Sequence, residues 1–390
     1  MMLFVLSECL FNRWDDSEEN KENLKKFFET LVLINKKEKK HFVILESRRI
    51  LKLIDEDFKK YMGDYIINYI QEISSSMFLN LKSVEELSLT DIIFLTYDKL
   101  DIQDNFRFIP YKYFIESDSL QNLNFITEHI LNDEQIFEII GKYYLSYCIN
   151  EELKNLFELK WVPNNGGGSN IKDVLVSYCN RENIPLTLFI VDGDMKSPIK
   201  PGNGSTARGI KQEFKKCEIN FNKFKNNEIT LNTNIVNYLK IKIEILKVRE
   251  IENLIPIKYM EKENFNGIEQ YKKLLYVNNE ITKFFDVKDG IYCKDKEKNF
   301  KSLNDCELLD ICTKDMKYYC KILKENGIDF FKIDEGKDIL KKFVNYISED
   351  LEKFNELIEN CIYMEIKDEI LRIGKLIFSW GISIKNVNKL

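Results

Sequence analysis

An apolar run from Leu186 to Val191 that ends in Asp192-Gly193-Asp194 constrains the fold of this chain more than any other stretch. Branched and aromatic residues bounded by turn-forming residues predict a buried parallel strand that is covered on both faces. Acidic side chains directly after such a strand lie at its carboxyl end, where open α/β sheets bind their ligands. The stretch therefore predicts a functional site at one edge of a parallel sheet.

The segments before this strand also alternate between strand and helix patterns. We expect strands at residues 123–127 and 156–162, and helices at residues 133–147 and 171–179. Glu128 follows the first of these strands. Parallel strands joined by helices bring their carboxyl ends to one edge of the sheet, so Glu128 is expected beside Asp192 and Asp194.

Three carboxylates that meet in one cleft repel one another unless a cation neutralises them. Mg²⁺ or Mn²⁺ is the natural cation, because both ions prefer hard oxygen ligands. The chain contains only two histidines, His41 and His129, so a histidine base, paired histidine ligands or a Ser-His-Asp triad has almost no residues to use. Hydrolytic chemistry in this protein is therefore expected to rest on carboxylates and a metal ion.

A glycine-rich turn follows the second predicted strand and precedes the next predicted helix. It consists of Gly166, Gly167, Gly168, Ser169 and Asn170. Glycines let the backbone approach a ligand closely, and the free N–H groups at the start of a helix attract anions. The turn could therefore bind a phosphate group, or it could be a plain loop.

Two basic side chains follow the paired aspartates. Lys196 comes two residues after Asp194, and Arg208 belongs to a flexible loop expected from Pro198 to Gly209. Either side chain could contact a phosphate group beside the metal site, and either could face solvent. The loop could clamp a nucleic-acid backbone.

Length and composition predict a folded protein with more than one domain. A chain of 390 residues with 44% hydrophobic and 31% charged residues suits two or three domains, each with its own core. We expect a small α/β domain of open role at residues 1–115, a catalytic α/β domain at 120–256 and a helical domain at 257–390. The predicted fold class is α/β, with a parallel sheet in the centre of the chain.

Charge and cysteine content limit the partners and the compartment. A net charge of −6 gives no general attraction to nucleic acids, which leaves local basic patches as the means of binding them. Nine cysteines without a CxxC pair, in a chain without a secretory signal, favour reduced thiols in the cytoplasm. The sequence contains no run of about 18 apolar residues, so no membrane-spanning helix is expected.

The order and spacing of these motifs resemble the Toprim domain, which type IA and II topoisomerases, bacterial primases and the overcoming-lysogenization-defect (OLD) family of nucleases share. The resemblance rests on residues 125–128 with Asp133, 166–170, 192–194 and 248–254. The last of these segments contains Glu250 and Glu252 and is similar to an acidic segment of OLD-related proteins. Together the segments cover about a third of the chain.

The resemblance implies a metal-dependent nuclease that hydrolyses phosphodiester bonds in DNA or RNA. Asp192 and Asp194 would hold one or two Mg²⁺ or Mn²⁺ ions. Glu128 would be a metal ligand or the general base, and Glu250 or Glu252 would complete the ligand shell. These roles are what the likeness implies for the matching positions of this sequence.

Several parts of larger Toprim proteins do not occur in this sequence. It contains no Walker A motif GxxxxGK[ST], so the ATPase of full OLD proteins is missing, and neither a primase zinc finger nor a topoisomerase breakage domain can be identified. By analogy, such a protein would be the effector of a bacterial anti-phage defence system, regulated by a partner such as an ATPase or sensor encoded nearby. It could also form a homo-oligomer. The alternative is a non-catalytic Toprim-fold scaffold or sensor that binds a partner protein or nucleic acid.

Overall fold

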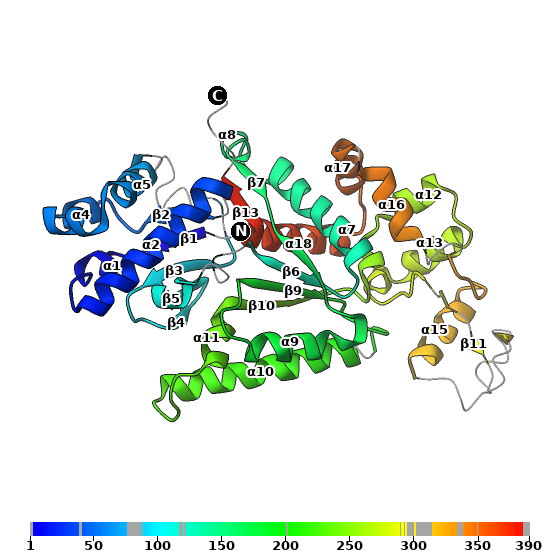
Figure 1. Cartoon of the computed structure of the whole chain (residues 1–390). Helices are drawn as coiled ribbons and strands as arrows, with labels where there is room; N and C mark the ends of the chain where they lie inside the picture. Colours follow the sequence, from blue (N-terminus) through cyan, green and yellow to red (C-terminus); the bar gives the residue numbers. More distant parts are fainter. Residues whose placement is uncertain are drawn as a thin grey trace.

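The computed structural model describes most of the chain and shows a mixed α/β protein (Figure 1). The described residues are 3–38, 41–75, 87, 89–116, 120, 122–199, 202–288, 290–291, 293–294, 300–301, 314–333, 338–348 and 350–384. Parallel pairing dominates the two main sheets, in agreement with the predicted α/β class. No helix in those ranges is long and apolar enough to cross a membrane.

The first sheet is built from the early part of the chain. Its strands are β1 Leu3–Leu6, β2 Phe42–Leu45, β3 Ile92–Thr96, β4 Asp101–Gln103 and β5 Phe106–Pro110. They lie in the order β2-β1-β3-β5-β4, and only the pairing of β4 with β5 is antiparallel. The helices of this part are α1 Glu8–Asn12, α2 Glu18–Glu38, α3 Ile50–Leu53, α4 Glu56–Met62 and α5 Asp64–Ser75. Strands and helices alternate along this part of the chain, which agrees with the α/β class predicted for it.

The second sheet lies in the centre of the chain. Its strands are β6 Asn124–Thr127, β8 Val162–Asn165, β9 Thr187–Val191 and β10 Ile241–Ile245, in the order β10-β9-β6-β8, and every pairing is parallel. On one side lie α9 Ile171–Asn180, α10 Ser205–Lys225 and α11 Thr233–Lys240, and on the other lies α7 Ile130–Tyr143 (Figure 1). Cover on both faces explains why every residue of β9 is buried and none is charged.

Two elements of this central region differ from the sequence predictions. The single strand predicted at residues 156–162 is two strands, because β7 Phe157–Leu159 pairs antiparallel with β13 Ile382–Ile384 while β8 joins the central sheet. Between β7 and α7 lies the short helix α8 Glu151–Lys154. The predicted flexible loop at residues 198–209 is wrong for its last part, since α10 begins at Ser205. Residues 200 and 201 of that loop lie outside the described residues.

Helices make up most of the described residues of the last region, for which the sequence predicted a helical domain. They are α12 Ile257–Lys262, α13 Ile268–Val277, α15 Lys314–Glu325, α16 Ile339–Ile347, α17 Leu351–Glu359 and α18 Met364–Gly381, and the short strands β11 Cys293–Lys294 and β12 Phe300–Lys301 pair antiparallel. In Figure 1, α18 runs from this region back toward the central sheet and lies beside α7.

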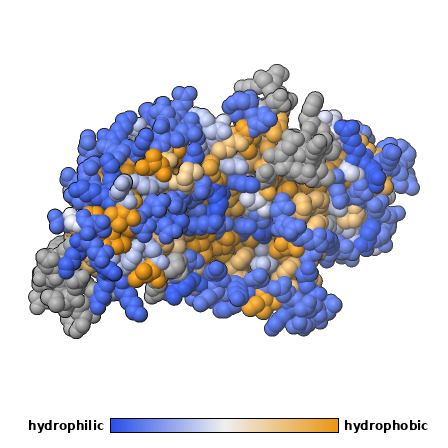
Figure 2. All heavy atoms as spheres, turned by 180° about the vertical axis from the view of Figure 1, so that it is seen from behind, coloured by the Kyte–Doolittle hydropathy of each residue, from blue (hydrophilic) through white to orange (hydrophobic). Residues whose placement is uncertain are grey.

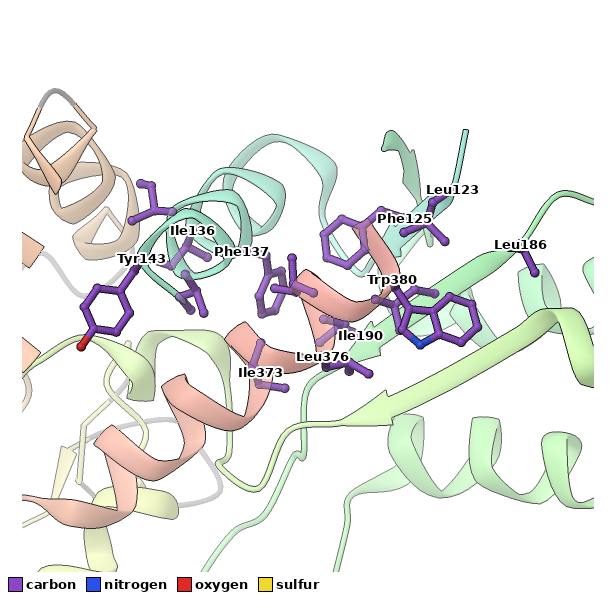
Figure 3. Packing of buried hydrophobic residues seen from close by; sticks show 14 of the residues in the cluster. Leu123, Phe125, Ile136, Phe137, Tyr143, Leu186, Ile190, Ile373, Leu376 and Trp380 are labelled. Carbon is purple, nitrogen blue, oxygen red and sulfur yellow. The ribbon is translucent and has the colours of Figure 1, made fainter. Parts of the chain in front are cut away.

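The last helix completes the core of the central sheet. Leu376 and Trp380 of α18 lie in one buried cluster with Ile190 of β9 (Figure 3). Phe137 of α7 packs edge-on against Phe125 of β6, with ring centroids 5.7 Å apart. Since burial of large apolar side chains is the main stabilising contribution to a fold, the central sheet depends on a helix that lies more than a hundred residues further along the chain.

A buried ion pair joins the first sheet, the central sheet and α18. Nε of Arg107 is 2.8 Å from Oδ1 of Asp91, and the two residues are only 6% and 4% exposed. Nη1 of Arg107 donates to the carbonyl oxygens of Leu239 and Ile241, over 2.9 and 3.0 Å. Nε1 of Trp380 donates to the other Asp91 oxygen over 3.0 Å. Each charged group is therefore satisfied by partners from a different part of the chain.

Candidate metal centre

Glu128 and Asp192 meet at the carboxyl edge of the central sheet. Strands β6 and β9 are parallel neighbours, with Ile126 opposite Phe189, so the residues that follow them leave the sheet side by side. The backbone N–H of Asp192 donates to Oε1 of Glu128 over 3.1 Å. The structure thus brings together the two acids whose approach the sequence predicted.

Two further acids reach this edge from the segment after β10. The short 3₁₀ helix η5 Ile251–Leu254 begins here, and the N–H of Ile251 donates to Oδ1 of Asp192 over 3.0 Å. Glu252 lies in the first turn of η5 and is 4% exposed, and Glu250 precedes the helix. A free N–H at a helix start stabilises a carboxylate, so the position of Asp192 is set by η5.

Asp194 lies at the mouth of the site in an unusual backbone conformation. Its φ is +50°, in the left-handed region that few residues other than glycine adopt. Its N–H donates to the carbonyl oxygen of Arg249 over 2.7 Å, and the N–H of Gly204 donates to that of Gly193 over 3.1 Å. Strained residues that surrounding contacts hold in place cluster at functional sites.

Lys288 neutralises part of the acidic cluster. Its Nζ is 2.9 Å from Oε1 of Glu252 and 3.3 Å from Oε2 of Glu250. No motif or spacing in the sequence marks this lysine, because it lies beyond α13 and reaches the cluster only through the folding of the last region. It is the main charged residue of the site that the sequence predictions missed.

Burial and mutual repulsion raise the pKa values of the acids. For Glu128, burial is the largest cause, the N–H of Asp192 opposes it and the charge of Asp194 adds to it, which brings the pKa to about 7. Burial raises the pKa of Glu252 to about 6, against the attraction of Lys288. Burial, then repulsion from Glu128 and Glu252, raises the pKa of Asp192 well above its usual value. A cation that neutralised these groups would be bound favourably.

The donor set suits a divalent cation. Glu128, Asp192 and Glu252 offer carboxylate oxygens, the ligands that Mg²⁺ and Mn²⁺ prefer. Oε2 of Glu252 is buried without a hydrogen-bond partner, as is Oε2 of Glu250 despite its ion pair, and unpartnered buried oxygens cost free energy unless something binds them. Within the described ranges, no three acidic, histidine or cysteine side chains already surround a common point. Ligation would therefore require these side chains to turn toward an ion.

The glycine turn packs against the end of strand β6, next to Glu128. The N–H groups of Gly166 and Gly168 donate to the carbonyl oxygens of Thr127 and Glu128, over 2.7 and 3.0 Å. The N–H of Gly167 donates to the side-chain oxygen of Asn165 over 2.9 Å. The N–H of Asn170 donates to the carbonyl oxygen of Gly167 over 3.2 Å. Four of the five amides of the turn are thus engaged within the protein, and phosphate binding by the turn stays a prediction. The side chains of Ser169 and Asn170 are exposed to solvent.

A polar cleft of about 590 Å³ opens beside the acidic cluster. Its acidic lining is Asp194, Glu250 and Asp315, and its cationic lining is Lys196, Arg208, Arg249 and Lys314, beside the first turn of α10. Lys196 and Arg208 were predicted to lie near the site and do so. Arg249 and Lys314 were not predicted, and Lys314 comes from α15, far along the chain. Cations beside a helix N-terminus favour an anion such as phosphate.

Gly193 is required by the close approach of two backbone segments. A Cβ at this position would lie 2.2 Å from the carbonyl oxygen of Val248 and 2.5 Å from that of Leu246. We expect Gly193→Ala to lower the free energy of unfolding by about 1–3 kcal/mol, the range for overpacking. Gly202→Ala is the matched control, because a Cβ there meets nothing within 4 Å. Urea denaturation measures both, and equal stability of the two variants would show that the backbone at Gly193 has room.

The raised pKa values predict how the metal-free protein responds to pH. Glu128 and Glu252 have ordinary pKa values of 4.5 and folded values of about 7 and about 6. Both states are protonated below pH 4.5, but at higher pH the folded state holds protons that the unfolded chain has lost. Stability is therefore expected to fall as pH rises from about 4.5 to about 7, and Mg²⁺ should stabilise the protein more near pH 7.5 than near pH 5.

Thermal unfolding in EDTA and in Mg²⁺ at the two pH values measures this effect. The double variant Glu128→Gln/Glu252→Gln is the control and should show a flatter pH dependence and little gain from Mg²⁺. An equal gain from Mg²⁺ at both pH values would mean that these two carboxyls do not bind the ion.

Comparison with known proteins assigns no family, because no family model, no curated protein and no solved structure matches the chain.

Proposed function

We propose that the protein is a divalent-metal-dependent nuclease that hydrolyses phosphodiester bonds at this acidic cluster, in a Toprim-like catalytic domain. One observation carries the proposal: Glu128 and Asp192 are in contact at the carboxyl edge of a parallel sheet, beside a polar cleft whose lining includes four cationic and three acidic side chains. Carboxylates suit a metal ion, and cations suit the phosphate that the metal would activate. A site of this kind combines both in one place.

The acids divide into ligands and a base. Asp192, Asp194 and Glu252 would hold one or two Mg²⁺ or Mn²⁺ ions, with Glu250 completing the shell and Glu128 as a further ligand or the base. Such ions, when bound, polarise the scissile phosphate and lower the pKa of a bound water. Lys288 would offset the remaining negative charge, because its Nζ contacts both Glu250 and Glu252.

Glu128 has the properties of a general base. In the metal-free protein its pKa is about 7, within the range that suits a general base near neutral pH. The N–H of Asp192 engages Oε1 and fixes the carboxylate. The proton of the attacking water would therefore go to Oε2.

Lys196 and Arg208 would bind the phosphate oxygens and stabilise the negative charge that builds up as the bond breaks. The backbone of both residues is held at the rim of the cleft. Tyr319 donates its hydroxyl to the carbonyl of Lys196 over 3.1 Å, and the backbone N–H of Arg208 donates to the carbonyl of Gly204 over 3.0 Å.

The likeness of the site segments to Toprim motifs supports a nuclease of this type. In that setting the protein would be the regulated effector of a bacterial anti-phage defence system. A partner such as an ATPase or sensor encoded nearby would release its activity, since the chain has no Walker A motif of its own.

A non-catalytic scaffold or sensor is the second candidate, and the ion pairs of Lys288 favour it. They neutralise part of the cluster without any metal. In that function the acids would have a structural role, and the fold would bind a partner protein or a nucleic acid.

Cleavage assays decide between the two candidates. Labelled single-stranded DNA, duplex DNA, RNA and tRNA are incubated with the wild type in Mg²⁺, Mn²⁺ or EDTA. The nuclease proposal predicts products only with a metal ion, and cleavage about 100-fold slower or less in Glu128→Gln. Glu182→Gln is the control, since Glu182 is exposed and lies outside the site. If no substrate is cleaved with any metal, even with the neighbouring gene products present, the scaffold function replaces the nuclease.

A further inference from the structure

Hydrophobic residues are exposed on one face of the protein, where Figure 2 shows them in a hollow band. An apolar cavity of about 630 Å³ lies between α10 and the edge strand β10. Phe214 of α10, Ile243 and Ile245 of β10, Met195 and Phe284 supply its apolar lining. Its volume falls in the range of roughly 300–1,000 Å³ that is usual for small-ligand sites.

This cavity adjoins the polar cleft of the candidate metal centre. Asn203 lines both, and Met195 of the cavity lies in the chain between Asp194 and Lys196 of the cleft. A ligand with one apolar part and one anionic part could therefore occupy both spaces across a shared rim.

The charge around the cavity favours an anionic ligand. Four lysines line it, at Lys211, Lys215, Lys247 and Lys283, against the two acids Glu218 and Glu244. Glu244 is already paired with Arg372, so the side chains that line the cavity carry a net positive charge. An occupant with regular negative charges, such as a nucleic-acid backbone, complements this rim.

A peptide strand added to the edge of the sheet fits less well. An exposed edge strand recruits another strand through its unpaired backbone groups. Two carbonyls of β10 are already covered, since Arg107 donates to that of Ile241 over 3.0 Å and Arg372 to that of Ile245 over 3.4 Å. The apolar side chains of the cavity, rather than the backbone edge, are what is available.

We infer that this cavity receives a nucleobase of a single-stranded nucleic acid whose neighbouring phosphate lies in the polar cleft. The inference rests on the proposed nuclease function and specifies its substrate class. Phe214 provides the aromatic surface for stacking, held from behind by Tyr238 at a ring-centroid distance of 5.0 Å. In a duplex the bases are stacked and paired within the helix, so only an unpaired or extruded base can enter such a pocket.

Binding of short fluorescent oligonucleotides tests the inference without relying on cleavage. Asp192→Asn protein is titrated in Mg²⁺ with a single-stranded DNA, a duplex of the same sequence and an abasic strand of the same length, and anisotropy is recorded. We expect the normal single strand to bind more tightly than both the abasic strand and the duplex. Adding Phe214→Leu should lower the affinity for the normal strand by about tenfold and leave the affinity for the abasic strand unchanged, because base stacking on an aromatic ring is lost.

Matched control variants distinguish the loss of contacts in the cavity from other effects of changing helix α10. Ile219→Ala changes an exposed apolar residue of the same helix outside the cavity and should alter nothing. Lys215→Glu should weaken the normal and abasic strands alike, whereas Lys223→Glu, exposed on the same helix but outside the cavity, should have little effect on either. Ile243→Asn, at the partly exposed edge strand, replaces Phe214→Leu if the latter unfolds.

The outcomes distinguish this inference from the proposed function. The base pocket would be overturned if Phe214→Leu weakened the binding of the normal and abasic strands equally, or weakened neither. It would also be overturned if the duplex bound more tightly than the single strand. Cleavage of duplex DNA alone would do the same while leaving the nuclease intact. Base-dependent binding by a wild type that cleaves nothing would refute the nuclease and keep the pocket.

Discussion

Asp192→Asn is expected to abolish metal-dependent cleavage and, at the same time, to stabilise the metal-free protein. The asparagine keeps the oxygen that accepts the N–H of Ile251 but carries no charge. Repulsion from Glu128 and Glu252 then disappears, which should raise the free energy of unfolding by on the order of 1 kcal/mol. Loss of a ligand should slow cleavage by at least about 100-fold, since even outer-shell partners of metal sites contribute up to that factor.

Two measurements on the same preparation test whether Asp192→Asn both slows cleavage and raises stability. Urea denaturation in EDTA gives the stability, and single-turnover cleavage in Mg²⁺ or Mn²⁺ gives the rate. Asp173→Asn is the control, because Asp173 is an exposed acid on α9 outside the cluster and should change neither quantity. A less stable Asp192→Asn would show that the aspartate is held by attractive contacts, and unchanged cleavage would remove it from the site.

Arg107→Met is expected to cause a severe loss of stability. It leaves Asp91 buried, with Lys242 and Trp380 as its remaining partners among the described residues, and removes the donor for two carbonyls. Breaking a buried ion pair by removing one member costs about 3–5 kcal/mol, and the remaining contacts of Asp91 favour the lower end of that range. The first sheet should loosen from β10 and α18 as a result.

The control for this prediction is an exposed arginine. Arg13 pairs with Asp16 and Asp98 at the surface, where such pairs contribute about 0–1 kcal/mol. Guanidinium denaturation of Arg13→Met and Arg107→Met should therefore give very different midpoints. If both variants lose the same small amount, the Asp91 network does not hold the regions together.

The part of the site that could be predicted from sequence is the part that follows from strand direction. Glu128 and Asp192 each come directly after a strand of a parallel sheet, and parallel neighbours end at the same edge. The contact between them follows from that rule. The acids of the segment after β10 were predicted only through the likeness of their motif, because nothing local indicates that η5 begins against Asp192.

The remainder depends on packing between distant parts of the chain. Lys288 and Lys314 reach the site from the last region, whose position relative to the central sheet no local pattern determines. The split of the predicted strand at residues 156–162 has the same cause, since β7 finds its partner in β13 at the far end of the chain. The role of the glycine turn could not be decided from sequence, because Gly-rich loops serve close packing as readily as ligand binding, and the hydrogen bonds of its amides depend on the folded structure.

Anomalous diffraction from crystals grown with Mn²⁺ tests the central claim most directly, because it locates the ion itself. The proposal predicts a manganese peak at the carboxyl edge of the central sheet, bound by oxygens of Asp192 and Glu252 beside Glu128, and no such peak in Asp192→Asn crystals. The proposal would be contradicted if crystals grown at a saturating concentration of Mn²⁺ showed no peak at this edge and Lys288 remained paired to Glu250 and Glu252.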